Sequence, residues 1–233
     1  MLEPLYSIQL TCVCCEATFH TSRVRQSFKK AIKTDSDFCA YYKEGSNPDY
    51  YVVRVCPWCG FASTENSLET LNDRQKKNYL DHIGSKWSPR DYGGARTLEQ
   101  ALESYKIGLL CAQTVGEKNR VVAGLLHHIA WLYRYVSNKE QELRFLRFAL
   151  EAYIRVYETE DGSVSNARLM FLIGELYRRL DEPYEAVKWF GRVIHDKSIV
   201  DAAMIRASRG QWQLLREEMA AKKLALPEEM IDA

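Results

Sequence analysis

The chain has 233 residues, of which 46% are hydrophobic and 27% charged, so it is long enough to bury a core as a globular protein. Its 32 basic residues nearly equal its 31 acidic ones, so no overall field attracts nucleic acid or an anionic membrane. No apolar stretch reaches the length of a membrane span, and the first residues do not have the pattern of a signal peptide. We therefore expect a cytoplasmic protein without a membrane segment.

The first part of the chain predicts short strands joined by turns. Apolar and β-branched residues alternate over residues 6–10, 18–24 and 50–55, which is the pattern of strands. Residues 45–48 predict a turn, because glycine and the residue before proline both resist helix. Residues 65–82 predict a helix that bridges to the rest of the chain.

Two Cys-x-x-Cys pairs follow two of these strands. Cys12 and Cys15 form the first pair, and Cys56 and Cys59 form the second. Four thiolates on two tight turns make a tetrahedral cage that suits Zn²⁺ and leaves no open position for a substrate water. The odd total of seven cysteines also fits metal-bound thiolates in a reducing compartment better than a secreted disulfide framework. The sequence therefore predicts one structural zinc ion.

Other interpretations of these cysteines stay open. Cys14 could replace Cys12 if the first turn is slipped, but a bystander that points outward is the favoured interpretation. Cys39 could approach the site, although a half-buried packing role is favoured, and His20 is a conceivable ligand of a cage that four cysteines already fill. Cys56-Pro-Trp-Cys59 also resembles a glutaredoxin-type redox turn, which would need a βαβ sheet behind it. An iron–sulfur cluster is the remaining metal alternative.

From Thr97 onward the hydrophobic period is that of a helix. Thr97 and Gln100 have the spacing of a capping box, in which each side chain accepts a hydrogen bond from the other residue's backbone N–H. Further helices are predicted at residues 117–136, 138–159, 165–180, 182–196 and 198–220. Cys111 lies inside a helix, where packing is its expected role.

These helices have the pattern of a tetratricopeptide repeat. One unit is formed by Met170, Ile173, Gly174, Tyr177, Ala186, Phe190 and Val193. An earlier and degenerate unit includes Ala130 and Ala149, with Glu142 where a small residue belongs. Gly174 and Ala186 are predicted to face each other across a close helix pair. A generic helical bundle is the alternative.

The pattern as a whole predicts an α+β protein with two domains. Residues 1–92 form a small zinc-ribbon-like β domain with its bridging helix, and residues 93–233 form an all-α, tetratricopeptide-like helical array. The chain resembles the bacterial family called domain of unknown function 2225 in four segments: residues 13–19, 35–39, 47–48 and 53–62. The resemblance implies the same combination of a zinc ribbon with repeat helices, and it implies no activity. Glu16 departs from the family, which usually has glycine at this position.

The sequence contains no motif of a nucleotide-binding loop, a zinc protease or a serine hydrolase, so we expect a protein that is not an enzyme. Repeat helices expose a concave face that binds protein or peptide, and a non-catalytic adaptor or scaffold is the favoured function. Four arginines there predict an acidic partner: Arg120, Arg134, Arg168 and Arg178.

The second function that the sequence allows is association with nucleic acid. Zinc ribbons often serve such machinery, and five basic residues come before the next acid: Arg23, Arg25, Lys29, Lys30 and Lys33. A solvated edge of a small domain is the favoured interpretation of this run. A thiol redox protein is the third function that we consider.

Overall fold

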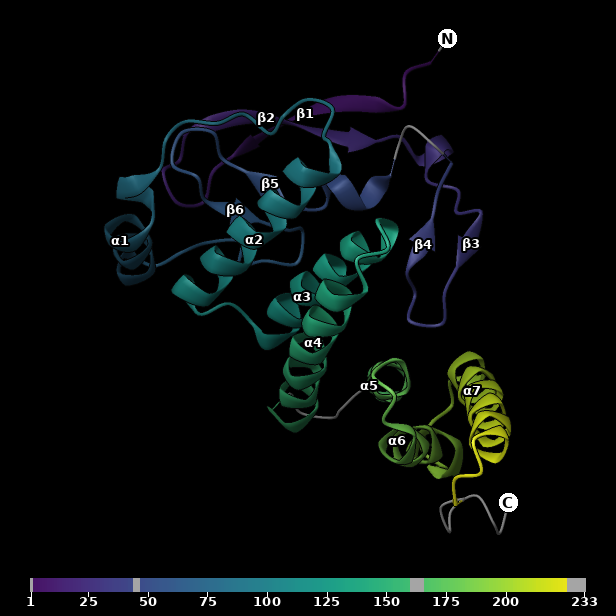
Figure 1. The fold of residues 1–233 in the computed structure, drawn as a ribbon. Coiled ribbons are helices and arrows are strands. Elements are labelled where there is room, and N and C mark those ends of the chain that lie inside the picture. The colour runs from purple at the N-terminus through teal and green to yellow at the C-terminus, as the bar shows by residue number, and fades with distance from the viewer. Residues whose placement is uncertain (1, 44–46, 160–165, 226–233) are drawn as a thin grey trace. The chain divides into compact units, whose positions relative to one another are not determined.

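Figure 1 shows the fold in a computed structural model, which describes residues 2–43, 47–159 and 166–225. The chain forms two compact units, residues 1–145 and residues 146–233. The division falls inside the helix α4 (Lys139–Thr159). The division into domains 1–92 and 93–233 concerned which parts of the chain fold independently, and it stays a prediction.

Within the described residues, the β structure of the first unit consists of three antiparallel strand pairs. β1 (Leu5–Thr11) pairs with β2 (Thr18–Val24) along its whole length. β3 (Lys33–Thr34) pairs with β4 (Ala40–Tyr41), and β5 (Arg54–Val55) pairs with β6 (Ala62–Ser63). The predicted strands at residues 6–10 and 18–24 are confirmed.

Only the end of the predicted strand at residues 50–55 is extended. A 3-10 helix, η2 (Pro48–Tyr51), takes the place of its first half. The side chain of Asn47 caps η2 by accepting a hydrogen bond from the Asp49 N–H at 2.9 Å. The alternating apolar pattern is instead explained by three buried side chains, those of Tyr51, Val53 and Val55, of which Val53 and Val55 belong to one core cluster.

Three helices follow these strands: α1 (Asp73–His82), α2 (Leu98–Val115) and α3 (Asn119–Tyr135). The capping box of Thr97 and Gln100 is confirmed at the start of α2. The prediction of a helix from residue 65 was wrong about where it begins, because Asn72 and Gln75 form a second capping box that starts α1 at Asp73.

The core of the first unit lies between the strand pairs and these helices. α2 packs along β5 and β6, as Figure 1 shows. Val53, Tyr79, Tyr105 and Ile129 are completely buried there. The Tyr105 hydroxyl donates to the Asp49 carbonyl at 2.9 Å, which joins α2 to η2.

A buried arginine that the sequence pattern did not reveal joins the same elements. Arg96, directly before α2, is only 7% exposed. Its guanidinium donates to the carbonyls of Tyr50 at 2.9 Å and Val53 at 2.7 Å, and its Nε donates to the Tyr92 carbonyl at 2.8 Å. It therefore satisfies carbonyl groups of η2 and of the segment before β5, which would otherwise be buried without partners.

The second unit consists of the later part of α4, α5 (Ala167–Arg179), α6 (Pro183–His195) and α7 (Ala202–Ala221). α5 and α6 form a helical hairpin, and α7 packs against both of them (Figure 1). Small strand pairs followed by helices confirm the predicted α+β class. The helices at 117–136, 138–159, 182–196 and 198–220 are confirmed with shifts at their ends, and the start of the predicted helix at 165–180 touches residues outside the described ranges.

The close approach predicted at Gly174 is present, but its partner differs from the prediction. A Cβ added to Gly174 would lie 2.8 Å from Cε1 of Phe190 and 3.2 Å from the Cβ of Trp189. Ala186, on the same helix as Phe190, is fully buried, but none of its atoms is among the three nearest to the added Cβ. The absence of a side chain at Gly174 therefore makes room for the Phe190 ring.

Replacing Gly174 with leucine is expected to cost roughly 1–3 kcal/mol, because the added side chain overlaps Phe190 in a packed core. Thermal melts followed by circular dichroism measure the loss. Gly210→Leu in α7 is the matched control, since a Cβ at Gly210 meets nothing within 4 Å. Equal melting temperatures for the two variants would contradict the packing described here.

Candidate metal centre

Two loops of equal length close two of the strand pairs, and each loop carries one cysteine pair. Residues 12–17 join β1 to β2, and residues 56–61 join β5 to β6. In the first loop the Glu16 N–H donates to the Cys12 carbonyl at 2.9 Å, and the Cys12 N–H donates to the Ala17 carbonyl at 3.0 Å. The same two bonds, both 2.9 Å, recur in the second loop among Cys56, Gly60 and Phe61.

The fifth residue of each loop has left-handed backbone geometry. Gly60 has a φ of 75°, and Glu16 has a φ of 62°. Gly60 is required by packing as well, because a Cβ there would overlap the ring of Trp87. Glu16 keeps the same turn with a side chain present, and its carboxylate accepts a hydrogen bond from Lys76 at 2.8 Å. The departure from glycine at residue 16 therefore does not shift the turn.

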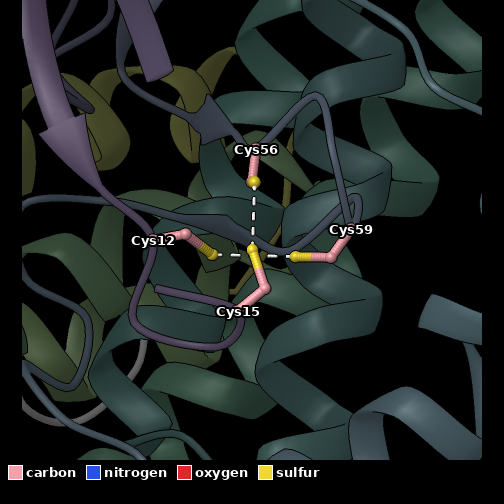
Figure 2. Close-up of side chains that lie close together, drawn as sticks. All are labelled: Cys12, Cys15, Cys56 and Cys59. Atoms are coloured by element: carbon pink, nitrogen blue, oxygen red, sulfur yellow. Dashed lines mark hydrogen bonds between the residues drawn. The ribbon is translucent and has the colours of Figure 1, made fainter. Parts of the chain in front are cut away.

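The two loops bring four sulfur atoms together, as Figure 2 shows. The Sγ atoms of Cys12, Cys15, Cys56 and Cys59 all lie within 4.8 Å of one another. Two of the separations are 3.6 Å, between Cys12 and Cys59, and 3.7 Å, between Cys15 and Cys56. A tetrahedral zinc ion with bonds of about 2.3 Å needs sulfurs about 3.8 Å apart. The cluster is thus compatible with a metal site of four thiolate ligands.

Hydrogen bonds from surrounding residues hold the second loop in place. The Tyr79 hydroxyl donates to the Cys59 carbonyl at 2.8 Å, and the Trp87 ring N–H donates to the Pro57 carbonyl at 2.9 Å. Cys111 of α2 accepts a hydrogen bond from the Ala62 N–H at 3.3 Å, directly after the second loop. Cys12, Cys56 and Cys59 are buried, whereas Cys15 is exposed. Solvent therefore reaches the cluster from the first loop.

The thiols influence one another strongly. A hydrogen bond with Cys12 is the largest cause that lowers the pKa of Cys56, to about 2. The same contact with Cys56 raises the pKa of Cys12 to about 12. Thiolate ligands must lose their protons before a metal binds, so metal binding at this cluster releases protons and is favoured by higher pH.

The remaining candidate ligands lie outside the cluster. Cys14 is buried next to it, rather than pointing outward, while the pair Cys12 and Cys15 keeps the predicted register. Cys39 is fully buried between β3 and β4, and burial raises its pKa to about 12. His20 is exposed on β2. Cys111 packs in the core as predicted.

A second polar cluster, which the sequence analysis missed, is built around Asp37. This side chain is completely buried in the turn between β3 and β4. Arg134 of α3 donates to both of its oxygens, at 2.6 and 2.9 Å. Trp131 and His127, one and two turns before Arg134 on α3, lie 3.2 and 3.3 Å from the same carboxylate. The turn 35–39 is thereby fixed to α3.

Two further carboxylates complete the partners of Arg134. Asp35 lies 3.1 Å from one of its terminal nitrogens, and Glu142 of α4 lies 2.7 Å from its Nε. Burial disfavours the charge of Arg134, but the hydrogen bonds and charge of Asp37 outweigh it, so the pKa of Arg134 is raised. Burial lowers the pKa of His127, which keeps that ring neutral. The cluster is therefore an internal ion pair network.

The four arginines predicted to bind a partner have different surroundings. The side chain of Arg134 is only 10% exposed, and three carboxylates surround it. Arg178 lies 2.9 Å from the buried Glu175. Arg120 and Arg168 are exposed in the first turns of α3 and α5. Arg120 and Arg134 belong to the first unit, and Arg168 and Arg178 belong to the second.

The basic run is divided in a similar way. Arg23 pairs with Glu65. Lys33 lies 3.0 Å from Asp35, and the Arg25 guanidinium lies 5.2 Å from the centre of the Tyr6 ring. Lys29 and Lys30 are exposed between η1 (Gln26–Phe28) and β3. The run is therefore not a continuous band of unpaired cations.

The fold and the site together define an α+β protein in which four cysteines on paired loops form a candidate metal centre, followed by a helical unit. Residues 5–215 match the family described as uncharacterized protein conserved in bacteria (DUF2225), and the chain belongs to this family. No curated protein and no solved structure matches the chain. In the described part of the chain, every helix is too short or too polar to cross a membrane.

Proposed function

We propose that this protein is a non-catalytic adaptor whose first unit is stabilised by zinc and whose second unit binds a protein partner. Zinc is the proposed ion because four thiolates in tetrahedral arrangement suit its softness and size. A cage of four protein ligands leaves no position for a substrate, so the metal has a structural role. The absence of catalytic motifs in the sequence supports the same proposal.

The observation that carries the adaptor proposal is a groove in the second unit, where α7 packs beside the end of α6. Its cavity measures about 370 Å³. The lining residues are Ile194, His195, Arg209, Trp212 and Gln213. Tryptophan and arginine are the residue types most enriched at the energetic centres of protein interfaces. The groove therefore offers an aromatic wall next to a cation.

The chemistry of the groove indicates an acidic partner. The ring N–H of Trp212 is buried and has no hydrogen-bond partner among the described residues, so it could donate to a carboxylate or carbonyl of a partner once the ring turns toward the groove that it lines. Arg209 is exposed at the rim, where it can pair with the same group. Arg168 remains an accessible member of the predicted arginine set, on another helix of this unit.

Reversing the charge at Arg209 is expected to abolish partner capture. The tagged wild-type protein, Arg209→Glu and Lys197→Glu would each be cross-linked in a bacterial lysate, and captured proteins compared by quantitative mass spectrometry. Lys197 is exposed in the loop after α6 and does not line the groove, so its variant is the matched control.

We expect an acidic protein that the wild type and Lys197→Glu enrich and that Arg209→Glu loses by about tenfold or more, the loss typical of a charge-assisted contact. Zinc content and helicity should be equal in all three proteins. Capture that is undiminished in Arg209→Glu would show that the groove is not the partner surface, and Arg168→Glu would then test an exposed arginine of the predicted set in this unit.

Two alternatives have less support. Association with nucleic acid would use the basic run, but Arg23 and Lys33 are paired with carboxylates of the chain. A thiol redox role would require a βαβ sheet, whereas β6 is the last strand within the described residues. Both alternatives predict activities that the adaptor proposal does not, namely filter binding of RNA or DNA and reduction of a disulfide substrate.

A further inference from the structure

A small cavity in the first unit is surrounded by three cations that come from separate parts of the chain. Arg23 lies on β2, Lys29 follows η1, and Arg54 lies on β5. All three line a cavity of about 230 Å³. The rest of its lining includes Tyr51 and the polar residues Thr64, Glu65 and Asn66. The cavity lies away from the four cysteines, of which none lines it.

Arg54 is the most informative of these cations. Among the described residues no hydrogen bond or ion pair reaches its guanidinium, and its Nε is buried without a partner. Burial, and to a smaller extent the charge of Arg23, lowers its pKa. Arg54 is half-buried, and a donor that loses water without gaining an acceptor costs free energy, so an anion beside its guanidinium would make the arrangement more favourable.

The charge around the cavity favours an anion with more than one negative charge. Arg23 pairs with Glu65, whose carboxylate offsets one of the three positive charges. Arg54 and Lys29 have no acidic partner among the described residues. Two uncompensated cations beside one cavity match a phosphate group in its dianionic form.

From this arrangement we propose that the cavity binds a phosphate group of a small ligand, with Arg54 as its central donor and Arg23 and Lys29 on either side. The volume decides against a large ligand inside it, because cavities for drug-sized molecules begin at roughly 300 Å³. Guanidinium groups bind phosphate by paired hydrogen bonds, and the lysine adds a mobile charge. This site is separate from the proposed adaptor groove and does not depend on it.

The test is a calorimetric titration of the metal-loaded, full-length protein with inorganic phosphate. We expect one saturable site per chain in the wild type. Arg54→Gln should weaken binding roughly tenfold to a hundredfold, since a charged donor is lost. Lys29→Gln should weaken it less, and Lys30→Gln should not change it, because Lys30 is the adjacent lysine and does not line the cavity.

Lys29→Gln is an exposed change that leaves the fold intact, so the proposal stays testable even if Arg54→Gln is unstable. Absence of saturable phosphate binding in the wild type would overturn the proposal. Equal weakening by Lys29→Gln and Lys30→Gln would also overturn it, because that result describes a diffuse positive surface. A parallel titration with a single-stranded oligonucleotide identifies this outcome, since such a surface would bind the oligonucleotide with steep salt dependence.

Discussion

Replacing Cys56 with serine is expected to remove the metal and unfold the strand pairs of the first unit, while the helices of the second unit persist. Structural zinc contributes on the order of 10 kcal/mol to a site of this kind, which exceeds the net stability of most small units. Cys56 is completely buried, and the core that surrounds the cysteines includes Phe61 and Tyr79. Loss of the metal therefore affects the core as well as the loops.

Metal analysis of protein purified in reducing buffer, without added zinc, should give close to one zinc per chain for the wild type and none for Cys56→Ser. Circular dichroism should show a partial loss of structure in the variant, with helical signal remaining. Cys14→Ser is the matched control, because Cys14 is buried in the first loop but lies outside the four-sulfur cluster. Fresh wild-type protein without metal would refute the zinc centre.

The second large effect is expected at Asp37. Replacing it with alanine leaves the buried Arg134 and His127 without their shared acceptor. Breaking a buried ion pair by removing one partner costs roughly 3–5 kcal/mol, and we expect a loss near the lower end because Asp35 and Glu142 still pair with Arg134. We expect a similar loss in Arg134→Met, since Asp37 itself is completely buried.

Denaturant unfolding of the zinc-loaded protein measures both variants. The double variant Asp37→Ala with Arg134→Met should be less destabilised than the sum of the single changes, because it leaves no unpaired charge between these two positions. Arg120→Ala is the control on the same helix, where removal of an exposed arginine should change stability by less than about 0.5 kcal/mol. A wild-type unfolding curve for Asp37→Ala would contradict the network.

The parts of the fold that depend on local signals could be predicted from the sequence. The capping box at Thr97 and the strand at residues 18–24 are examples, because their patterns are complete within a few residues. Each cysteine pair is also a local signal, since its spacing specifies a tight turn, and the preference of one metal ion for four thiolates predicted that the two turns meet. The start of α1 was missed, although Asn72 and Gln75 also have the spacing of a capping box.

The parts that depend on partners distant in the sequence could not be predicted. Arg134 was assigned to a partner surface because the repeat pattern predicted that its helix lines a concave face, and only the fold reveals Asp37 beside it. Glu142 stands where the repeat pattern predicts a small residue, and the fold shows that its carboxylate also pairs with Arg134. Arg54 gave no signal at all, because a single arginine in a short strand is ordinary until its surroundings are known.

The distance along the chain between Asp37 and Arg134 has a consequence for synthesis. These residues are 97 positions apart. Tyr105 and Cys111, which pack in the core around the cysteines, also follow the cysteine loops in the chain. The strands therefore leave the ribosome well before the helices that cover them. Until α3 has emerged, the N-terminal segment has reduced thiols and no completed core, so a metal ion captured at that stage would stabilise a nascent chain that cannot yet finish folding.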